Sequence, residues 1–180
     1  VLRAVVVDGD VVTTAGDGSI VLRTTTGELI LNDGTAAADN TAVSANGSGN
    51  ILIQAMGALT DITANADVKS GTGNVSVLAA QNVEFTAPAD IVTTANGTID
   101  VLAGTGSVTM DPASLFQSTG ADGDIRLMAA QNVIVGDLEA DADVSIVATA
   151  GGITDADALV AGGNDGDIAI TSGGLRLWAG

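Results

Sequence analysis

Aliphatic residues recur along the chain in a short phrase: a glycine, a small polar residue, and two aliphatic residues separated by one position. Alternation with period two is typical of a short β-strand with one buried face. The glycine supplies the backbone freedom that a corner needs. Copies of the phrase stand at residues 18–22, 49–53, 73–77, 97–101, 123–127, 142–146 and 166–170, with Ala142 replacing glycine in the sixth copy.

A second aliphatic phrase, opened by Gly or Gln, follows each copy of the first. It predicts a second set of strands, and Asp61 and Asp155 interrupt it where we expect the strand to end early. A third, looser strand is expected around Val68, Ile91, Leu115 and Leu159. The inward residues of the second phrase are Leu29/Leu31, Leu59, Val83/Phe85, Val108/Met110, Val133/Val135, Ile153 and Leu175/Leu177.

Three strands and three corners repeated every 24 residues or so predict an all-β chain, a single-stranded parallel β-helix (β-solenoid) of about seven coils. We assign residues 18–180 to this repeat domain and residues 1–17 to an N-terminal edge or incomplete coil. A β-sandwich would also have short strands, but it has no reason to repeat Ala-Ala-Gln-Asn-Val at 79–83 and 129–133. Small residues at one fixed offset should form a column at a tight corner: Ala55, Ala79, Ala103, Ala129 and Ala148.

Charge and composition narrow the classes of partner. The formal net charge is −17, which repels nucleic acid and anionic membranes and favours cations, calcium above all. The chain has no Cys and no His, so the usual zinc sites, thiol nucleophiles, imidazole bases and disulfides are excluded. Its aliphatic runs are too short for a membrane-spanning helix.

In each copy of the first phrase, a polar residue stands directly before the first aliphatic residue. Stacked coils bring these polar residues together in a ladder along the axis. Amides there can hydrogen-bond along the axis, whereas the stacked carboxylates Asp124, Asp143 and Asp167 should repel one another. Either these three splay into water or a cation, with calcium as the candidate, bridges them. Residues 162–170 resemble the calcium-binding nonapeptide of β-rolls, although that motif needs tandem copies and a cluster of turn glycines also explains it.

Catalysis is not expected. Asp61, Asp111, Asp137 and Asp155 are conceivable members of an acidic site such as β-helical pectinolytic enzymes use. No His is present, and aromatic residues, the usual platform for sugars, make up 2% of the chain. Trp178 follows Leu177, so its side chain should face outward. The third segment of the repeat varies most in length and is longest at residues 34–48. Recognition of a partner is expected in this segment.

The phrases Gly-Asn-Val-Ser-Val-Leu-Ala, Gly-Asp-Ile-Arg-Leu-Met-Ala and Ala-Gln-Asn-Val resemble the repeats of filamentous-haemagglutinin-like exoproteins and related giant bacterial surface adhesins, over roughly residues 18 to 177. The resemblance implies a secreted or cell-surface bacterial protein with a rod-like shaft. It also implies contact with a host, bacterial or matrix receptor, of which carbohydrate is one class. The amino-terminal secretion domain of such exoproteins is not seen here, so an internal shaft segment is expected.

From these patterns we expect a structural and interaction module, an acidic shaft with end-to-end contacts to adjoining repeats of a longer chain. No catalytic residue and no cofactor other than calcium is expected. A carbohydrate-active β-helix enzyme, a polysaccharide lyase or hydrolase, and a calcium-stabilised β-roll-like module are the alternatives.

Overall fold

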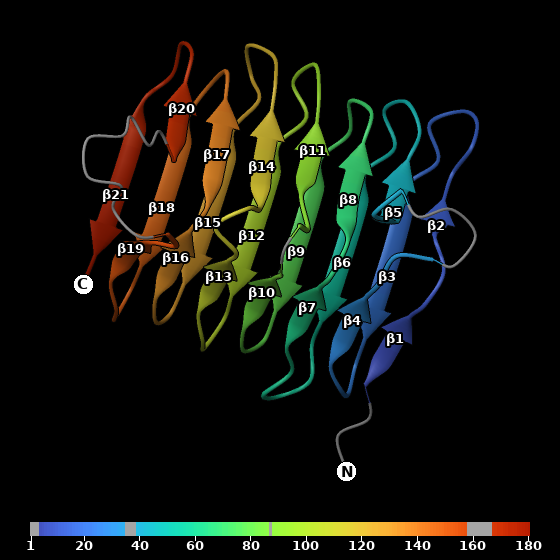
Figure 1. Ribbon diagram of the computed structural model, residues 1–180, viewed down its shortest axis with the longest axis horizontal. Helices are drawn as coiled ribbons and strands as arrows, with labels where there is room; N and C mark the ends of the chain where they lie inside the picture. The colour runs from blue at the N-terminus through green and yellow to red at the C-terminus, as the bar shows by residue number, and fades with distance from the viewer. Residues whose placement is uncertain (1–3, 35–38, 87, 158–166) are drawn as a thin grey trace.

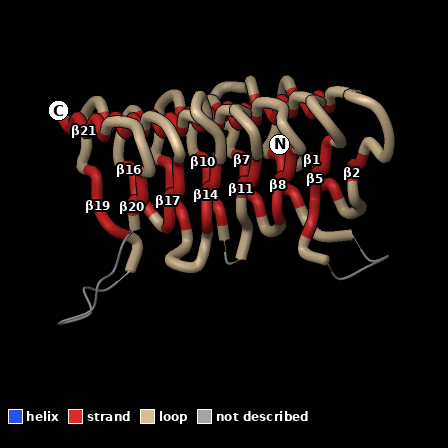
Figure 2. The backbone as a smooth tube through the Cα atoms, turned by 90° about the horizontal axis from the view of Figure 1, so that it is seen from above, coloured by secondary structure: helices blue, strands red, loops and turns tan. Residues whose placement is uncertain are grey.

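The computed structural model describes residues 4–34, 39–86, 88–157 and 167–180, and these contain strands and turns but no helix. The strands form three parallel sheets of seven strands each, and successive coils follow one another in sequence order along one axis (Figure 1). In the perpendicular view the coils form an open row of similar loops (Figure 2). The all-β, three-strand-per-coil solenoid that the sequence predicts is therefore confirmed.

Each sheet takes one strand from every coil. Sheet A contains β1 (Val5–Val7), β4 (Leu29–Leu31), β7 (Ile62–Ala64), β10 (Val83–Phe85), β13 (Val108–Met110), β16 (Val133–Val135) and β19 (Ile153–Asp155). Sheet B contains β2 (Val11–Val12), β5 (Thr41–Ala45), β8 (Asp67–Ser70), β11 (Ile91–Thr93), β14 (Leu115–Ser118), β17 (Asp137–Ala140) and β20 (Ile168–Ile170). Sheet C contains β3 (Ile20–Thr24), β6 (Ile51–Ala55), β9 (Val75–Ala79), β12 (Ile99–Ala103), β15 (Ile125–Ala129), β18 (Val144–Ala148) and β21 (Leu175–Ala179).

Equivalent residues of neighbouring coils lie directly opposite one another. Ile51, Val75, Ile99 and Ile125 are successive partners in sheet C, and all are buried. With parallel strands about 4.8 Å apart, seven coils make a rod roughly 34 Å long. Residues 1–17 carry β1 and β2, which are the edge strands of sheets A and B.

The core is one continuous set of inward-facing aliphatic columns. The predicted alanine column is confirmed: Ala55, Ala79, Ala103, Ala129 and Ala148 are register partners, and each is at most 5% exposed. Buried hydroxyls close the corner between sheets B and C. Those of Ser70 and Thr93 donate to the carbonyls of Gly49 and Gly73 one coil away, at 2.9 and 2.7 Å.

The second coil differs from the prediction at Leu59. This residue is 64% exposed and has a positive φ of 60°, so it belongs to a turn rather than to the core. The strand begins three residues later, where Ile62 and Ala64 pair with Leu29 and Leu31. Asp61 therefore precedes a strand and does not cut one short.

The third strand is present in every coil, but its inward residue in β14 is Phe116 rather than Leu115. Phe116 pairs with Ile91 and Leu138 and is fully buried. Its ring meets that of Phe85 edge to face, with centroids 4.7 Å apart. The variable segment 34–48 contributes β5 to sheet B, and the predicted position Leu159 lies outside the described residues.

The last coil corrects two strand assignments. Ile168–Ile170 pairs with Leu138–Ala140 in sheet B, and Leu175–Ala179 pairs with Val144–Ala148 in sheet C. The phrase at 166–170 is thus the third strand of the coil that begins with β18, and the next strand of the first type is β21. Nor does β19 end early: Asp155 pairs with Val135.

Candidate functional site

Polar side chains at the corner before sheet C connect successive coils. In several coils the backbone N–H of the residue in this position donates to the side-chain oxygen of its counterpart in the preceding coil: Asn74 to Asn50 Oδ1 at 2.8 Å, and Thr98 to Asn74 Oδ1 at 3.0 Å. Asp143 donates in the same way to Asp124 Oδ1 at 3.0 Å, and Gly174 to Asp143 Oδ1 at 2.7 Å. The side chains thereby satisfy N–H groups where the ladder of the sheet begins.

This arrangement brings together two of the three carboxylates that the sequence places in a cation ladder. Asp124 and Asp143 occupy adjacent rungs, and each uses one oxygen on a backbone N–H. Asp167 is not the next rung, because it precedes β20 in sheet B, and Gly174 holds that place. The proposed three-carboxylate ladder is therefore wrong in its third member.

A second ladder of the same kind lies before sheet A, and sequence reasoning missed it. Asn82 donates through its backbone N–H and its Nδ2 to Asp61 Oδ1, both at 2.9 Å. Ser107 then donates to Asn82 Oδ1, Asn132 to Ser107 Oγ, and Gly152 to Asn132 Oδ1, at 2.9 to 3.2 Å. The sequence feature that could have predicted this ladder is the polar residue that precedes each valine of the second phrase.

The third ladder, before sheet B, is the most acidic. Asp67 is 5% exposed, accepts the N–H of Asp90 at 2.9 Å, and pairs with Lys69 Nζ at 2.7 Å. Asp90 in turn accepts the N–H of Leu115 at 2.8 Å. Burial raises the pKa of Asp90 most, and the nearby Asp67 and Asp137 raise it further, against the opposing effects of the Leu115 hydrogen bond and of Lys69.

Replacing Asp90 with asparagine should stabilise the protein at neutral pH. Because the folded state raises the pKa of Asp90 above its ordinary 3.8, ionisation of this carboxyl costs stability as the pH rises through that range. Asparagine keeps an acceptor for the Leu115 N–H and removes the charge. The melting temperature of Asp90→Asn should exceed that of the parent at neutral pH, and the difference should shrink to nothing on acidification to about pH 3.

The matched control is Asp122→Asn, because Asp122 is an exposed carboxylate on a loop. It should leave the melting temperature unchanged across the same pH range. A gain for Asp90→Asn that persists at acid pH would contradict the assignment.

Two groups of three carboxylates also converge in the described part of the chain. Ligand atoms of Asp10, Asp33 and Asp39 lie within 4.8 Å of one another, as do those of Asp155, Asp157 and Asp167. Hydrogen bonds within the chain account for part of each arrangement, since Asp10 accepts the Gly34 N–H and Asp155 the Asp157 N–H, both at 2.9 Å. Only Asp167 of the predicted metal ladder belongs to either group.

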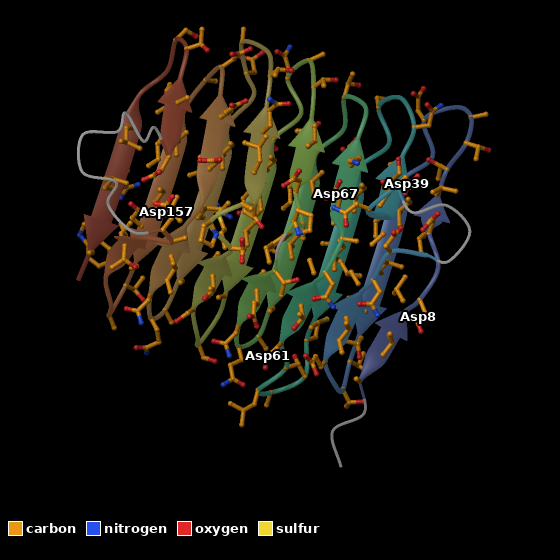
Figure 3. All side chains as sticks on the ribbon, in the orientation of Figure 1. Asp8, Asp39, Asp61, Asp67 and Asp157 are labelled. Atoms are coloured by element: carbon orange, nitrogen blue, oxygen red, sulfur yellow. The ribbon has the colours of Figure 1, made fainter. Side chains whose placement is uncertain are left out.

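The acids considered for catalysis do not form one site. Asp61 accepts a hydrogen bond from Asn82, and Asp111 accepts the N–H of Ala113 at 2.9 Å within its own turn. Asp155 lies in the last strand of sheet A. The two convergent groups of acids include neither Asp61, Asp111 nor Asp137. Acidic side chains are instead spread along the whole rod, as the labelled Asp8, Asp61 and Asp157 illustrate (Figure 3).

No family model, curated protein or solved structure matches this chain. The described residues include no helix with the length and hydrophobicity to cross a lipid bilayer. The basis for a functional proposal is therefore the fold, its three polar ladders and the distribution of charge.

Proposed function

We propose that this chain is a structural and interaction module, an acidic rod-like shaft segment of a secreted or cell-surface bacterial adhesin. The observation that supports this proposal is that the polar side chains at the corners form hydrogen bonds between coils. In all three corners, oxygens that a catalytic site would direct toward a substrate accept backbone N–H groups of the next coil. Such side chains strengthen the stack along its axis, which is what a shaft requires.

The remaining properties are consistent with that role. A parallel solenoid lengthens by about 4.8 Å with each coil, so it extends without changing its cross-section. A net charge of −17 opposes non-specific binding to nucleic acid and anionic membranes. The partners would be a receptor on a host cell, a bacterium or a matrix, with carbohydrate among the candidates, and the adjoining repeats of a longer chain at either end.

Mechanical unfolding tests the shaft directly. Pulled from its two ends, the rod should release whole coils in succession, because each coil is held mainly by its neighbours. One coil of 24 residues, the register interval between Val75 and Ile99, should lengthen the chain by roughly 80 Å per step. A single event that releases the entire chain at low force would argue against a shaft that withstands tension.

An enzyme assay tests the principal alternative. We expect no turnover of neutral or acidic polysaccharides by the purified protein. Turnover that disappears in Asp155→Asn or Asp111→Asn but survives in the control Asp122→Asn would overturn the shaft proposal in favour of a carbohydrate-active enzyme.

Calcium stabilisation is a separate alternative, which the convergent carboxylates make testable. An ion that binds the folded state must raise its stability by an amount that grows with the ion concentration relative to its Kd. A rise in melting temperature at millimolar calcium that is lost in Asp157→Asn, but retained in Asp122→Asn, would support a calcium-stabilised module. An unchanged melting temperature would exclude the calcium-stabilised module.

A further inference from the structure

The outer face of sheet C differs from the rest of the surface. Its outward side chains form two columns along the rod, with one residue of each column in every strand. The first contains Val21, Leu52, Ser76, Asp100, Arg126, Ser145 and Arg176, and the second contains Arg23, Gln54, Leu78, Leu102, Met128, Val147 and Trp178.

The second column ends in an unbroken apolar stripe over five successive strands. The stripe, which we define as Leu78, Leu102, Met128, Val147 and Trp178, is partly exposed, and Trp178 is 46% exposed. Sheet A has no counterpart, since Thr63, Glu84 and Thr109 occupy its outward column, and Lys69, Gln117 and Glu139 interrupt that of sheet B. A continuous apolar stripe on a soluble surface indicates contact with a partner.

The charges on this face are also unusual for so acidic a protein. Within the described strands of sheet C, the outward columns hold Arg23, Arg126 and Arg176 against one carboxylate, Asp100. Asp124 and Asp143 lie at its border, in the corner ladder. Two copies of a chain with a net charge of −17 repel each other over most of their surface, but this face does not add to that repulsion.

We propose that this face binds the same face of a second copy of the chain, related by a two-fold axis that runs parallel to the strands between β12 and β15. Rotation about that axis reverses the order of the coils but keeps each column opposite itself. Strand β12 then faces β15 of the second copy, and β9 faces β18. Such an interface is closed and self-complementary.

The residues that this operation brings together are chemically matched. Asp100 faces Arg126 of the other copy, and Arg126 faces its Asp100, so the bidentate pair within each copy, at 2.7 Å, becomes part of a four-charge network. In the apolar stripe, Leu102 faces Met128 and Leu78 faces Val147. Outside these, Ser76 faces Ser145, and Trp178 extends over Gln54.

The size of the face predicts a weak dimer. The six strands from β6 to β21, spaced by about 4.8 Å and each about 17 Å long, offer roughly 500 Å² per partner, against about 800 Å² for a standard stable interface. Repulsion between the two acidic rods opposes association and is screened by salt. Dimerisation should therefore be concentration-dependent and should strengthen as the ionic strength rises.

Sedimentation velocity of the full chain across the micromolar to millimolar range tests this proposal. We expect a monomer–dimer equilibrium that shifts toward dimer at high salt and is lost in Leu102→Lys. The matched control is Ile134→Lys, an outward position on sheet A, which should dimerise like the parent and have a similar melting temperature to Leu102→Lys. A monomer at every concentration, open-ended oligomers, or a dimer that Ile134→Lys disrupts and Leu102→Lys does not would overturn the proposal.

A charge exchange tests the two-fold axis itself. Arg126→Asp places two carboxylates opposite each other across the interface and should weaken the dimer at least tenfold. Adding Asp100→Arg to that variant restores both the pair within each copy and the pairs between copies, so dimerisation should return. A double variant as weak as the single one would exclude this axis.

Discussion

Truncation of Phe116 to alanine is expected to lower the free energy of unfolding by about 3–5 kcal/mol. Phe116 is fully buried, and its ring packs edge to face on Phe85 with centroids 4.7 Å apart. Coils above and below hold the surrounding backbone in register, so the cavity left by the ring cannot collapse. Chemical denaturation followed by circular dichroism measures the change.

The neighbouring Leu115 provides the control. Leu115 is only partly buried, and it faces outward because Phe116 takes the inward position of β14. Leu115→Ala should therefore cost less than about 1 kcal/mol. If Leu115→Ala were the more damaging of the two, β14 would have the opposite face inward.

Substitution of Gly73 by alanine should cost about 2–3 kcal/mol, at the upper end of the range for overpacking. A Cβ on Gly73 would clash with the carbonyl oxygen of Gly49, one coil away, and would lie 2.5 Å from the carbonyl carbon of the same residue. These are backbone atoms in the corner before sheet C, so they cannot move without disturbing the strands that follow. The cost arises from crowding between coils, since Gly73 is not among the glycines with a positive φ.

Gly9→Ala is the corresponding control, because a Cβ there would have no neighbour within 4 Å. It should be neutral, or stabilising by up to about 1 kcal/mol through the unfolded state. Equal losses for Gly9→Ala and Gly73→Ala would show that glycine is needed for local conformation rather than for the close approach of coils. Denaturation midpoints of the two variants distinguish these explanations.

The middle of the rod could be predicted because two independent patterns agree there. Period-two alternation identifies the buried face of Val75–Ala79 and Ile99–Ala103, and the 24-residue interval between them sets which residues stack. The alanine column follows from the same interval. Agreement between local alternation and the repeat interval leaves one register for these strands.

The predicted strands were wrong where the period-two alternation and the repeat interval do not agree. In the second coil, Leu59 and Ile62 both suit a strand, and only the left-handed turn at Leu59 shows that the strand begins later. Leu115 and Phe116 are adjacent and both apolar, so alternation alone cannot decide which one faces the core. Ile168–Ile170 repeats the first phrase in residue types, but the order of sheets makes it a third strand.

The polar ladders were predicted only in part. The sequence indicated that side chains such as Asn50 and Asn74 would hydrogen-bond along the axis, and they do. Their donor is the backbone N–H of the next coil, and this follows from the geometry of the corner rather than from residue type. The same reassignment of the last coil that moves Ile168 to sheet B removes Asp167 from the rung beyond Asp143.

Distances between spin labels on sheet A test the stacking of coils most directly. The outward residues Val6, Ile30, Ile134 and Thr154 belong to one column of register partners, away from the face of sheet C. Labelled cysteines at Ile30/Ile134, Ile30/Thr154 and Val6/Thr154 should be about 19, 24 and 29 Å apart, a gain of one strand spacing per coil. Distances that fail to grow by this increment, or that fold back as the number of intervening coils rises, would contradict a parallel stack.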